Sequence, residues 1–181
     1  SILLFQLKKM FKKINFGAQD CHYSDLGAFT GDISPLMLKK INCKYVIIGH
    51  SERRMYHFEN NLIIKKKIIA TLKNNLTPII CIGENLDVKI KKNTKSFLSK
   101  QLTSVLPKTI NKKIIIAYEP IWAIGSGKTP SLKEICDINA HIRKVINNLN
   151  SSYKNSYILY GGSVDKKNST IFLKSENIDG L

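Results

Sequence analysis

The chain has few acidic side chains and very little arginine. Its 181 residues include 13 aspartates and glutamates against 29 lysines and arginines, which gives a formal net charge of +16. Such a balance can indicate a nucleic-acid or anionic-membrane partner. Arginine occurs only as Arg53, Arg54 and Arg143, however, and the lysines come with abundant isoleucine and asparagine, as AT-rich coding would produce. Because no nucleic-acid readout motif is present, we expect no nucleic-acid partner, with a polyanion partner as the weaker alternative.

Cysteine is also scarce, and its spacing does not suit a metal site. The four cysteines form no CxxC pair, and no histidine accompanies them at the spacing of a zinc site. The sequence therefore predicts no metal. Unpaired cysteines of this kind suggest a reducing compartment, so we expect a cytoplasmic location.

Long apolar runs are absent as well. None approaches the roughly 20 residues of a membrane-spanning helix, so the sequence predicts no membrane partner. Hydrophobic residues make up 43% of the chain and charged residues 23%, as in ordinary globular domains. Residues 1–13 are basic and amphipathic and could mimic a transit peptide. Since the first residue is serine rather than methionine, we expect the natural chain to begin upstream.

Helical and strand patterns alternate along the whole chain. Short, largely apolar runs predict six strands, at residues 14–18, 45–48, 78–82, 114–118, 157–160 and from 178 onward. Helices are predicted at 2–11, from 35, at 60–76, 94–106, 131–149 and 166–173. Continuous apolar strands separated by helices indicate a parallel α/β sheet, either an open doubly wound sheet or a barrel. No GxGxxG follows the first strand, which weakens the open alternative, and no linker interrupts residues 1–181, so we expect one domain.

Polar and ionisable residues follow four of the predicted strands. They are the run His50-Ser51-Glu52-Arg53, Glu84, Glu119 and the run Gly161-Gly162-Ser163. In a parallel α/β barrel the carboxyl ends of the strands share the face that holds active sites. Any one of these groups could be a helix cap or a salt bridge, but four in succession favour a functional site.

Four segments resemble one known family, the triosephosphate isomerases. Residues 118–128, YEPIWAIGSGK, resemble the family's catalytic glutamate and mobile lid, and residues 49–54, GHSERR, resemble its histidine motif. Residues 160–163, YGGS, are similar to its phosphate loop, and residues 27–32, GAFTGD, to its dimer-contact loop. The resemblance implies a (β/α)8 barrel, a homodimer and a cofactor-free isomerase. The implied reaction converts dihydroxyacetone phosphate to glyceraldehyde 3-phosphate, in glycolysis and gluconeogenesis.

The resemblance assigns the catalytic roles to His50 and Glu119. Glu119 would carry a proton between two carbons, which suits a carboxylate whose basicity is raised by burial. His50 would donate a hydrogen bond to the enediolate oxygens. Glu52 would lie beside His50 as a third catalytic residue, although a local charge partner is a serious alternative for it.

Substrate phosphate and partner contacts are also implied by the resemblance. Gly125, Gly162 and Ser163 would bind the phosphate through backbone N–H groups and a hydroxyl. Thr30 would reach into the site of the partner subunit. Other polar residues of the motifs are expected to be structural: ion pairs for Arg53, Arg54 and Glu84, and packing for Cys81 and Trp122.

The chain departs from the family at both ends. The family's first strand carries an Asn-x-Lys motif whose lysine offsets the charge of the substrate, and no equivalent is present here. At the other end, residues 178–181 stop inside the eighth strand. We therefore expect about six of eight barrel units, a longer natural coding sequence, and no activity from these 181 residues alone. The alternatives are a non-enzymatic remnant that acts only in binding or assembly, and another phosphosugar isomerase on the same barrel.

Overall fold

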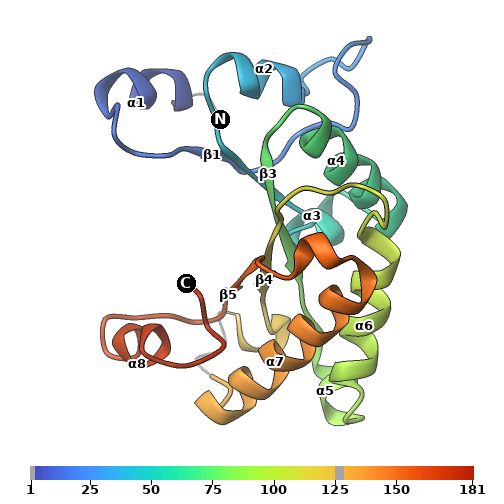
Figure 1. Ribbon diagram of the computed structural model, residues 1–181, viewed down its shortest axis with the longest axis vertical. Coiled ribbons are helices and arrows are strands. Elements are labelled where there is room, and N and C mark those ends of the chain that lie inside the picture. Colours follow the sequence, from blue (N-terminus) through green and yellow to red (C-terminus); the bar gives the residue numbers. More distant parts are fainter. Residues whose placement is uncertain (1–2, 125–128) are drawn as a thin grey trace. The chain divides into compact units, whose positions relative to one another are not determined.

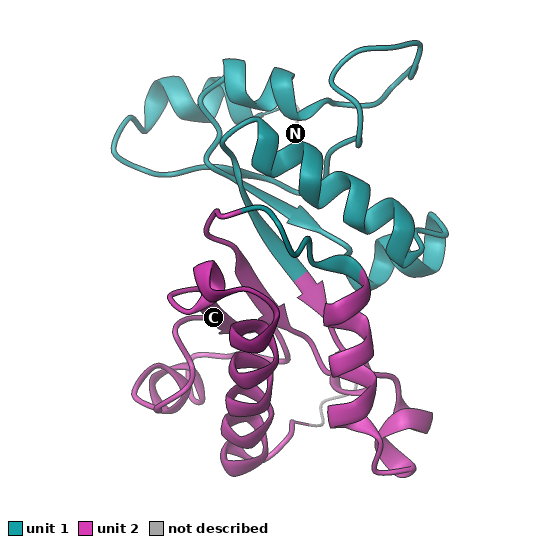
Figure 2. Cartoon of the chain, turned by 45° about the vertical axis from the view of Figure 1, so that its right-hand side comes forward, with its two compact units in different colours: residues 1–80, 105–110 teal, residues 81–104, 111–181 magenta. Residues whose placement is uncertain are grey.

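A computed structural model of the protein describes residues 3–124 and 129–181. The chain forms two compact units (Figure 2). Unit 1 comprises residues 1–80 and 105–110, and unit 2 comprises residues 81–104 and 111–181. Because compact units can be parts of one domain, the expected single domain stays a prediction.

The strands of each unit are parallel, as the sequence predicts, and pair in chain order (Figure 1). In unit 1, β1 (Gly17–Ala18) pairs with β2 (Tyr45–Ile48), and β2 pairs with β3 (Thr77–Ile82). In unit 2, β4 (Ile115–Tyr118) pairs with β5 (Tyr157–Tyr160). There the Glu119 N–H, just after β4, also donates to Ile82 O at the end of β3, at 2.8 Å. This sequential order fits a barrel and lacks the reversal of a doubly wound sheet.

Unit 1 contains four helices in its described residues. They are α1 (Leu4–Met10), α2 (Pro35–Lys40), α3 (Ser51–Tyr56) and α4 (Asn61–Lys73). The α2 helix begins as predicted, because the Ser34 hydroxyl accepts from Met37 N–H at 3.2 Å and proline occupies the first turn. The α4 helix packs on β2, and the buried side chains of Ile64 and Ile68 belong to the same core as Val46.

Unit 2 contains the remaining helices of the described chain. They are α5 (Leu86–Ile90), α6 (Thr94–Val105, whose last residue belongs to unit 1), α7 (Leu132–Leu149) and α8 (Ser169–Leu173), with 3-10 turns η1 (Ile121–Ala123) and η2 (Ser151–Tyr153). The Ser131 hydroxyl accepts from Glu134 N–H at 3.3 Å, which caps α7 as the sequence predicts. The buried face of α7 includes Ile135, Ile142 and Ile146.

The expected sixth strand is wrong in extent. From residue 178 onward the structure shows one isolated parallel bridge, between Gly180 and Leu159. The reason is local: the Asp179 carboxylate accepts from Ile158 N–H at 2.7 Å, so a side chain takes a donor that a strand carbonyl would otherwise use. Arg143 then fixes that carboxylate at 2.7 Å.

In residues 3–124 and 129–181 no helix is long and apolar enough to cross a membrane. The same residues contain no group of three or more histidine, cysteine, aspartate or glutamate side chains placed to hold a metal ion.

Candidate active site

In unit 1, His50 lies directly after β2 and begins α3. The preceding Gly49 has φ = 72°, in the left-handed region that favours glycine. The His50 ring caps the helix, because its Nδ1 accepts from Glu52 N–H at 3.3 Å. An accepting Nδ1 carries no hydrogen, so the proton of the neutral ring lies on Nε2. The cap therefore leaves Nε2–H as the hydrogen-bond donor of His50.

Glu52 lies beside the same ring but is largely exposed. Its Oε2 is 3.8 Å from His50 Nδ1, and its side chain is 74% exposed. This distance is too long for a hydrogen bond, and Nδ1 already accepts the backbone N–H of Glu52. The carboxylate of Glu52 is thus a nearby charge, and it does not hold a proton on Nδ1.

Arg54 ties the turn before His50 to α4. Its Nε donates to Gly49 O at 2.7 Å, and its Nη1 donates to Asn61 Oδ1 at 2.9 Å. A side chain at position 49 would lie 3.2 Å from Arg54 Nη2 and 3.1 Å from Ile64 Cδ1. The turn that presents His50 is therefore packed as well as hydrogen bonded.

Arg53 takes part in a buried ion network, in agreement with the expected ion pair. Its Nε lies 2.5 Å from Glu59 Oε1 and 2.9 Å from Asp20 Oδ2. Lys67, which is also buried, contacts the same two carboxylates at 2.6 Å and 2.8 Å. Two cations and two anions of unit 1 thus form one network, to which the helix that His50 begins contributes Arg53.

The two carboxylates of this network differ in pKa. Burial opposes ionisation of Glu59, but the hydrogen bonds and charges of Lys67 and Arg53 outweigh it and hold the pKa below its usual range. Burial dominates at Asp20 and raises its pKa, with Lys67 opposing the shift and the charge of Glu59 adding to it. Glu59 is therefore the carboxylate that remains charged to lower pH.

In unit 2, Glu119 is buried at the end of β4 and closely surrounded by backbone. A Cβ atom at Gly83 would lie 1.7 Å from Glu119 O, and one at Gly161 would lie 2.8 Å from Glu119 Cγ. Gly161 N–H also donates to Tyr118 O at 2.9 Å. Glycine at both positions lets neighbouring backbone approach Glu119 closely: Gly83 lies against its backbone and Gly161 against its side chain.

The predicted phosphate loop adjoins the segment that follows Glu119. Ser163 Oγ donates to Ala123 O at 3.0 Å, and Asn168 Nδ2 donates to Ser163 O at 3.2 Å. Gly162 faces the Tyr160 hydroxyl, which a Cβ atom would meet at 2.2 Å. The structure thus brings Glu119, Gly162 and Ser163 to the same end of strands β4 and β5. Gly125 lies outside the described residues.

Glu84 forms contacts other than the ion pair expected for it. Its Oε1 accepts from Trp122 Nε1 at 2.8 Å and from the Tyr118 hydroxyl at 3.2 Å, both neutral donors. Burial raises the pKa of Glu84, and these hydrogen bonds oppose the shift. Sequence reasoning missed this cluster because its members are far apart in the chain. The only signal was that Glu84 and Trp122 each stand shortly after a strand.

Lys89 of α5 also contacts Trp122, and sequence reasoning did not identify this residue either. Its Nζ lies 5.1 Å from the centroid of the Trp122 ring and forms an ion pair with Glu134 Oε1 in the first turn of α7. The side chain of Trp122 is therefore contacted through its N–H by Glu84 and over its ring by Lys89.

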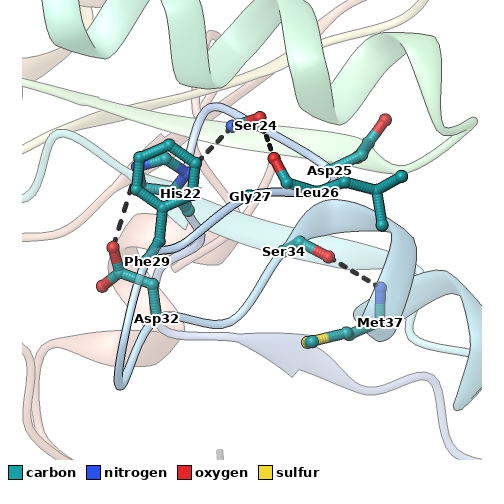
Figure 3. A pocket seen from close by; sticks show the side chains of 9 residues that line it. All are labelled: His22, Ser24, Asp25, Leu26, Gly27, Phe29, Asp32, Ser34 and Met37. Carbon is teal, nitrogen blue, oxygen red and sulfur yellow. Dashed lines mark hydrogen bonds and ion pairs between the residues drawn. The ribbon is translucent and has the colours of Figure 1, made fainter.

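Thr30 lies at the exposed tip of a loop that is folded on itself in unit 1. His22 N–H donates to Ile33 O at 2.9 Å and closes the base of the loop, and the His22 and Phe29 rings are stacked 3.9 Å apart. Beneath the loop is a cavity of about 130 Å³ (Figure 3). These contacts fix the loop's shape within one chain and leave Thr30 exposed.

Comparisons with known proteins agree with the motifs. The family model described as triosephosphate isomerase matches residues 1–181. A triosephosphate isomerase of Dehalococcoides mccartyi is 45% identical over 183 residues, covering 99% of this chain and 72% of the relative. Those of Mycoplasma capricolum and Aquifex aeolicus are 45% and 42% identical, covering 95% and 93% of this chain and 71% and 69% of the relatives. With the fold, its motifs and this match in agreement, the chain belongs to the triosephosphate isomerase family, whose fold is the (β/α)8 barrel.

Proposed function

We propose that Glu119 is the base and His50 the hydrogen-bond donor of a triosephosphate isomerase. The enzyme interconverts dihydroxyacetone phosphate and glyceraldehyde 3-phosphate, a step of glycolysis and gluconeogenesis. The observation that carries the residue roles is the environment of Glu119, a buried residue whose side chain lies against Gly161 in the proposed phosphate loop. No observation favours the alternative of a non-enzymatic remnant.

The reaction moves one proton between neighbouring carbons. The Glu119 carboxylate removes a proton from the hydroxyl-bearing carbon of dihydroxyacetone phosphate, leaving an enediolate, and returns it to the adjacent carbon. The hydroxyl proton ends on the former carbonyl oxygen, so atoms and charge balance. Burial favours the base because a carboxylate stripped of water binds a proton more strongly.

His50 stabilises the charge that develops on oxygen. Its Nε2–H is the donor, because Nδ1 accepts from Glu52 N–H and fixes the tautomer. A donor already oriented by the helix it caps needs no reorganisation during the reaction. The charge of Glu52 lies on the other side of the ring, so its proposed contribution is to the orientation and polarity of His50.

Gly162 and Ser163 bind the substrate phosphate in this proposal, together with Gly125 outside the described residues. Backbone N–H groups at glycines can approach an anion closely. The Ser163 hydroxyl donates to Ala123 O at 3.0 Å in this structure, so its backbone N–H is the donor available without a rearrangement of the hydroxyl. The phosphate loop and the turn after Glu119 are therefore linked directly.

The assembly, surroundings and cofactor requirement are further proposals. The self-supporting loop around Thr30 suits insertion into a second copy of the chain, which supports a homodimer. None of the cysteines in the described residues forms a disulfide, which supports the proposal of a reducing, cytoplasmic location. The proposed chemistry needs only side chains and backbone donors, with no cofactor and no nucleic-acid or membrane partner.

The test is an isomerase assay of the full-length protein with Glu119→Gln and His50→Ala variants. Glu119→Gln should retain substrate binding, because the phosphate donors remain, and lose most turnover. His50→Ala should lower turnover about 10²- to 10⁴-fold, the usual cost of a lost acid–base group. Near-normal turnover in either variant would contradict the role given to that residue. Nucleic-acid binding measured against salt concentration serves as the test of the polyanion alternative.

A further inference from the structure

Lys89 joins two segments of unit 2 that stand on either side of residues 125–128 in the chain. Its ammonium group lies 5.1 Å from the centroid of the Trp122 ring, within the range of a cation–π interaction. The same group forms an ion pair with Glu134, at the start of α7. The side chain of Lys89 is 27% exposed, so water screens these contacts only in part.

Glu84 fixes the edge of the Trp122 ring that carries the indole N–H. The indole N–H donates to Glu84 Oε1 at 2.8 Å, and Ile121 N–H donates to Glu84 O at 3.0 Å. Glu84 is fully buried and also accepts from the Tyr118 hydroxyl. One edge of the ring is thus attached to a rigid, buried carboxylate, while its face is covered by a cation that a surface substitution can remove.

The turn that carries Trp122 is linked closely to Glu119. Between them lie only Pro120, whose ring restricts the backbone at φ = −65°, and Ile121. Ala123, which ends the turn, accepts the hydrogen bond of Ser163 at 3.0 Å. A shift of the turn therefore displaces both the proposed base and the proposed phosphate loop.

We propose that Lys89 is a positioning residue for the isomerase reaction, which acts by holding the Trp122 ring against Glu84 and so fixing the turn next to Glu119. The inference rests on the proposed role of Glu119 as base. In unit 2 Lys89 contacts Trp122 and Glu134, and Trp122 is the one of the two that belongs to the turn next to Glu119, so the effect of Lys89 passes through Trp122. It should therefore appear in turnover more than in substrate affinity.

The kinetic test uses the full-length enzyme with Lys89→Met, which keeps the aliphatic stem and removes the charge. We expect kcat to fall about 3- to 10-fold and KM to stay within about twofold, the size of effect that a partly shielded cation–π contact can produce. Lys89→Arg should restore kcat, because arginine also stacks on an indole ring. Lys91→Met, at an exposed lysine of the same segment, is the matched control and should behave as wild type.

Glu134→Gln distinguishes two roles of Lys89: positioning of Trp122, and stabilisation of α7 through the ion pair with Glu134. It removes the charge that pairs with Lys89, leaves the cation over Trp122, and keeps a residue suited to the capping box of Ser131. We expect this variant to retain most of kcat. If Glu134→Gln reproduces the full loss seen in Lys89→Met, Lys89 acts through the helix and the proposal is overturned.

Fluorescence of Trp122 gives a readout independent of catalysis. Trp122 is the only tryptophan in these 181 residues, and subtracting the spectrum of a Trp122→Phe variant isolates its emission in the full-length protein. In Lys89→Met, acrylamide should quench this emission about twofold more strongly, because the cation no longer holds the ring against Glu84. Unchanged quenching together with unchanged kcat would overturn the proposal. If instead Glu119→Gln proves active, the base assignment fails while the fluorescence result still reports on Lys89.

Discussion

Gly161 follows β5 in unit 2 and lies against the side chain of Glu119. A Cβ atom there would be 2.8 Å from Glu119 Cγ, closer than nonbonded carbon atoms tolerate, and 3.3 Å from Oε1, a tight contact. The atoms it would meet belong to a side chain that can rotate. The backbone hydrogen bond from Gly161 N–H to Tyr118 O can therefore survive the substitution.

Gly161→Ala should consequently impair catalysis more than stability. We expect kcat to fall about 10- to 100-fold, since a displacement of the order of 1 Å at a reacting group can cost that much. The thermal unfolding midpoint should change little. The contrasting variant is Gly83→Ala. Its Cβ would collide with the backbone oxygen of Glu119 at 1.7 Å, and two backbone segments would have to move apart to relieve the collision. That variant should therefore lose stability as well as activity. Wild-type kcat in Gly161→Ala would show that the carboxylate position is not critical.

At this scale the sequence predicts residues that belong to continuous motifs and misses residues that meet only in the folded chain. His50, Glu119 and Ser163 each stand in a short motif at or soon after the end of a strand, so a reading of the sequence alone can single them out. Lys89 and Trp122 are joined by a contact between α5 and the turn after β4. No local pattern encodes that contact, because it depends on how two loops pack.

Among the elements, the buried apolar strands were predicted well and the irregular ends least well. The run at residues 45–48 is found unchanged as β2, since its four side chains are apolar and β-branched or aromatic. The expected strand at 14–18 is reduced to Gly17–Ala18, and the helix at 166–173 begins only at Ser169. In the second case Asp165 accepts from Lys167 and Asn168 N–H, and this side-chain turn replaces the first helical turn.

The loop of residues 27–32 is held in shape by contacts within unit 1. Gly27 and Gly31 have φ of 138° and 88°, which the tight loop requires, and Asp32 N–H donates to Phe29 O at 3.1 Å. The rings of His22 and Phe29 contact each other, with their centroids 3.9 Å apart (Figure 3). Thr30 is therefore presented at a preformed tip, and a preformed loop loses little entropy when it binds.

Changing the loop tip should weaken self-association without unfolding the chain. Thr30→Arg adds a long charged side chain at the exposed tip and leaves the cavity-lining residues in place. If the proposed dimer inserts this loop into a second copy, the dimer dissociation constant should rise at least about tenfold, because a buried unpaired charge is costly. Sedimentation velocity measures the change, with Thr103→Arg on α6 as the control. Unchanged dimers in Thr30→Arg and after deletion of the loop would refute the contact.

The stability of the whole molecule depends on local ion pairs that the net charge does not reveal. The chain carries a formal charge of +16, yet Lys67 and Arg53 are neutralised locally by Asp20 and Glu59. Four residues from separate segments of unit 1 form this network. From composition alone one expects the excess positive charges to repel one another. In the fold, two of these charges are instead paired with carboxylates in a largely buried cluster.

The contribution of Glu59 to the free energy of unfolding should decrease as the pH is lowered. Its pKa in the folded state is held below the usual 4.5 by Lys67 and Arg53, despite its burial. A depressed carboxyl pKa contributes stability that is present above the unfolded pKa and is lost as pH falls through the folded value. Glu59→Gln should therefore destabilise the protein by about 3 kcal/mol near pH 7, because it leaves buried cations short of one anion.

That difference between Glu59→Gln and wild type should shrink steadily as the pH is lowered below about 4.5, where the wild-type carboxylate also becomes neutral. Urea unfolding at a series of pH values measures it. Asp20→Asn is the matched comparison, because burial raises the pKa of Asp20 and reverses the sign of its linkage. A raised carboxyl pKa favours the folded state more at low pH, so the deficit of Asp20→Asn should grow on acidification. If both deficits shrink in parallel, the two carboxylates share one titration, and the separate role given to Glu59 is wrong.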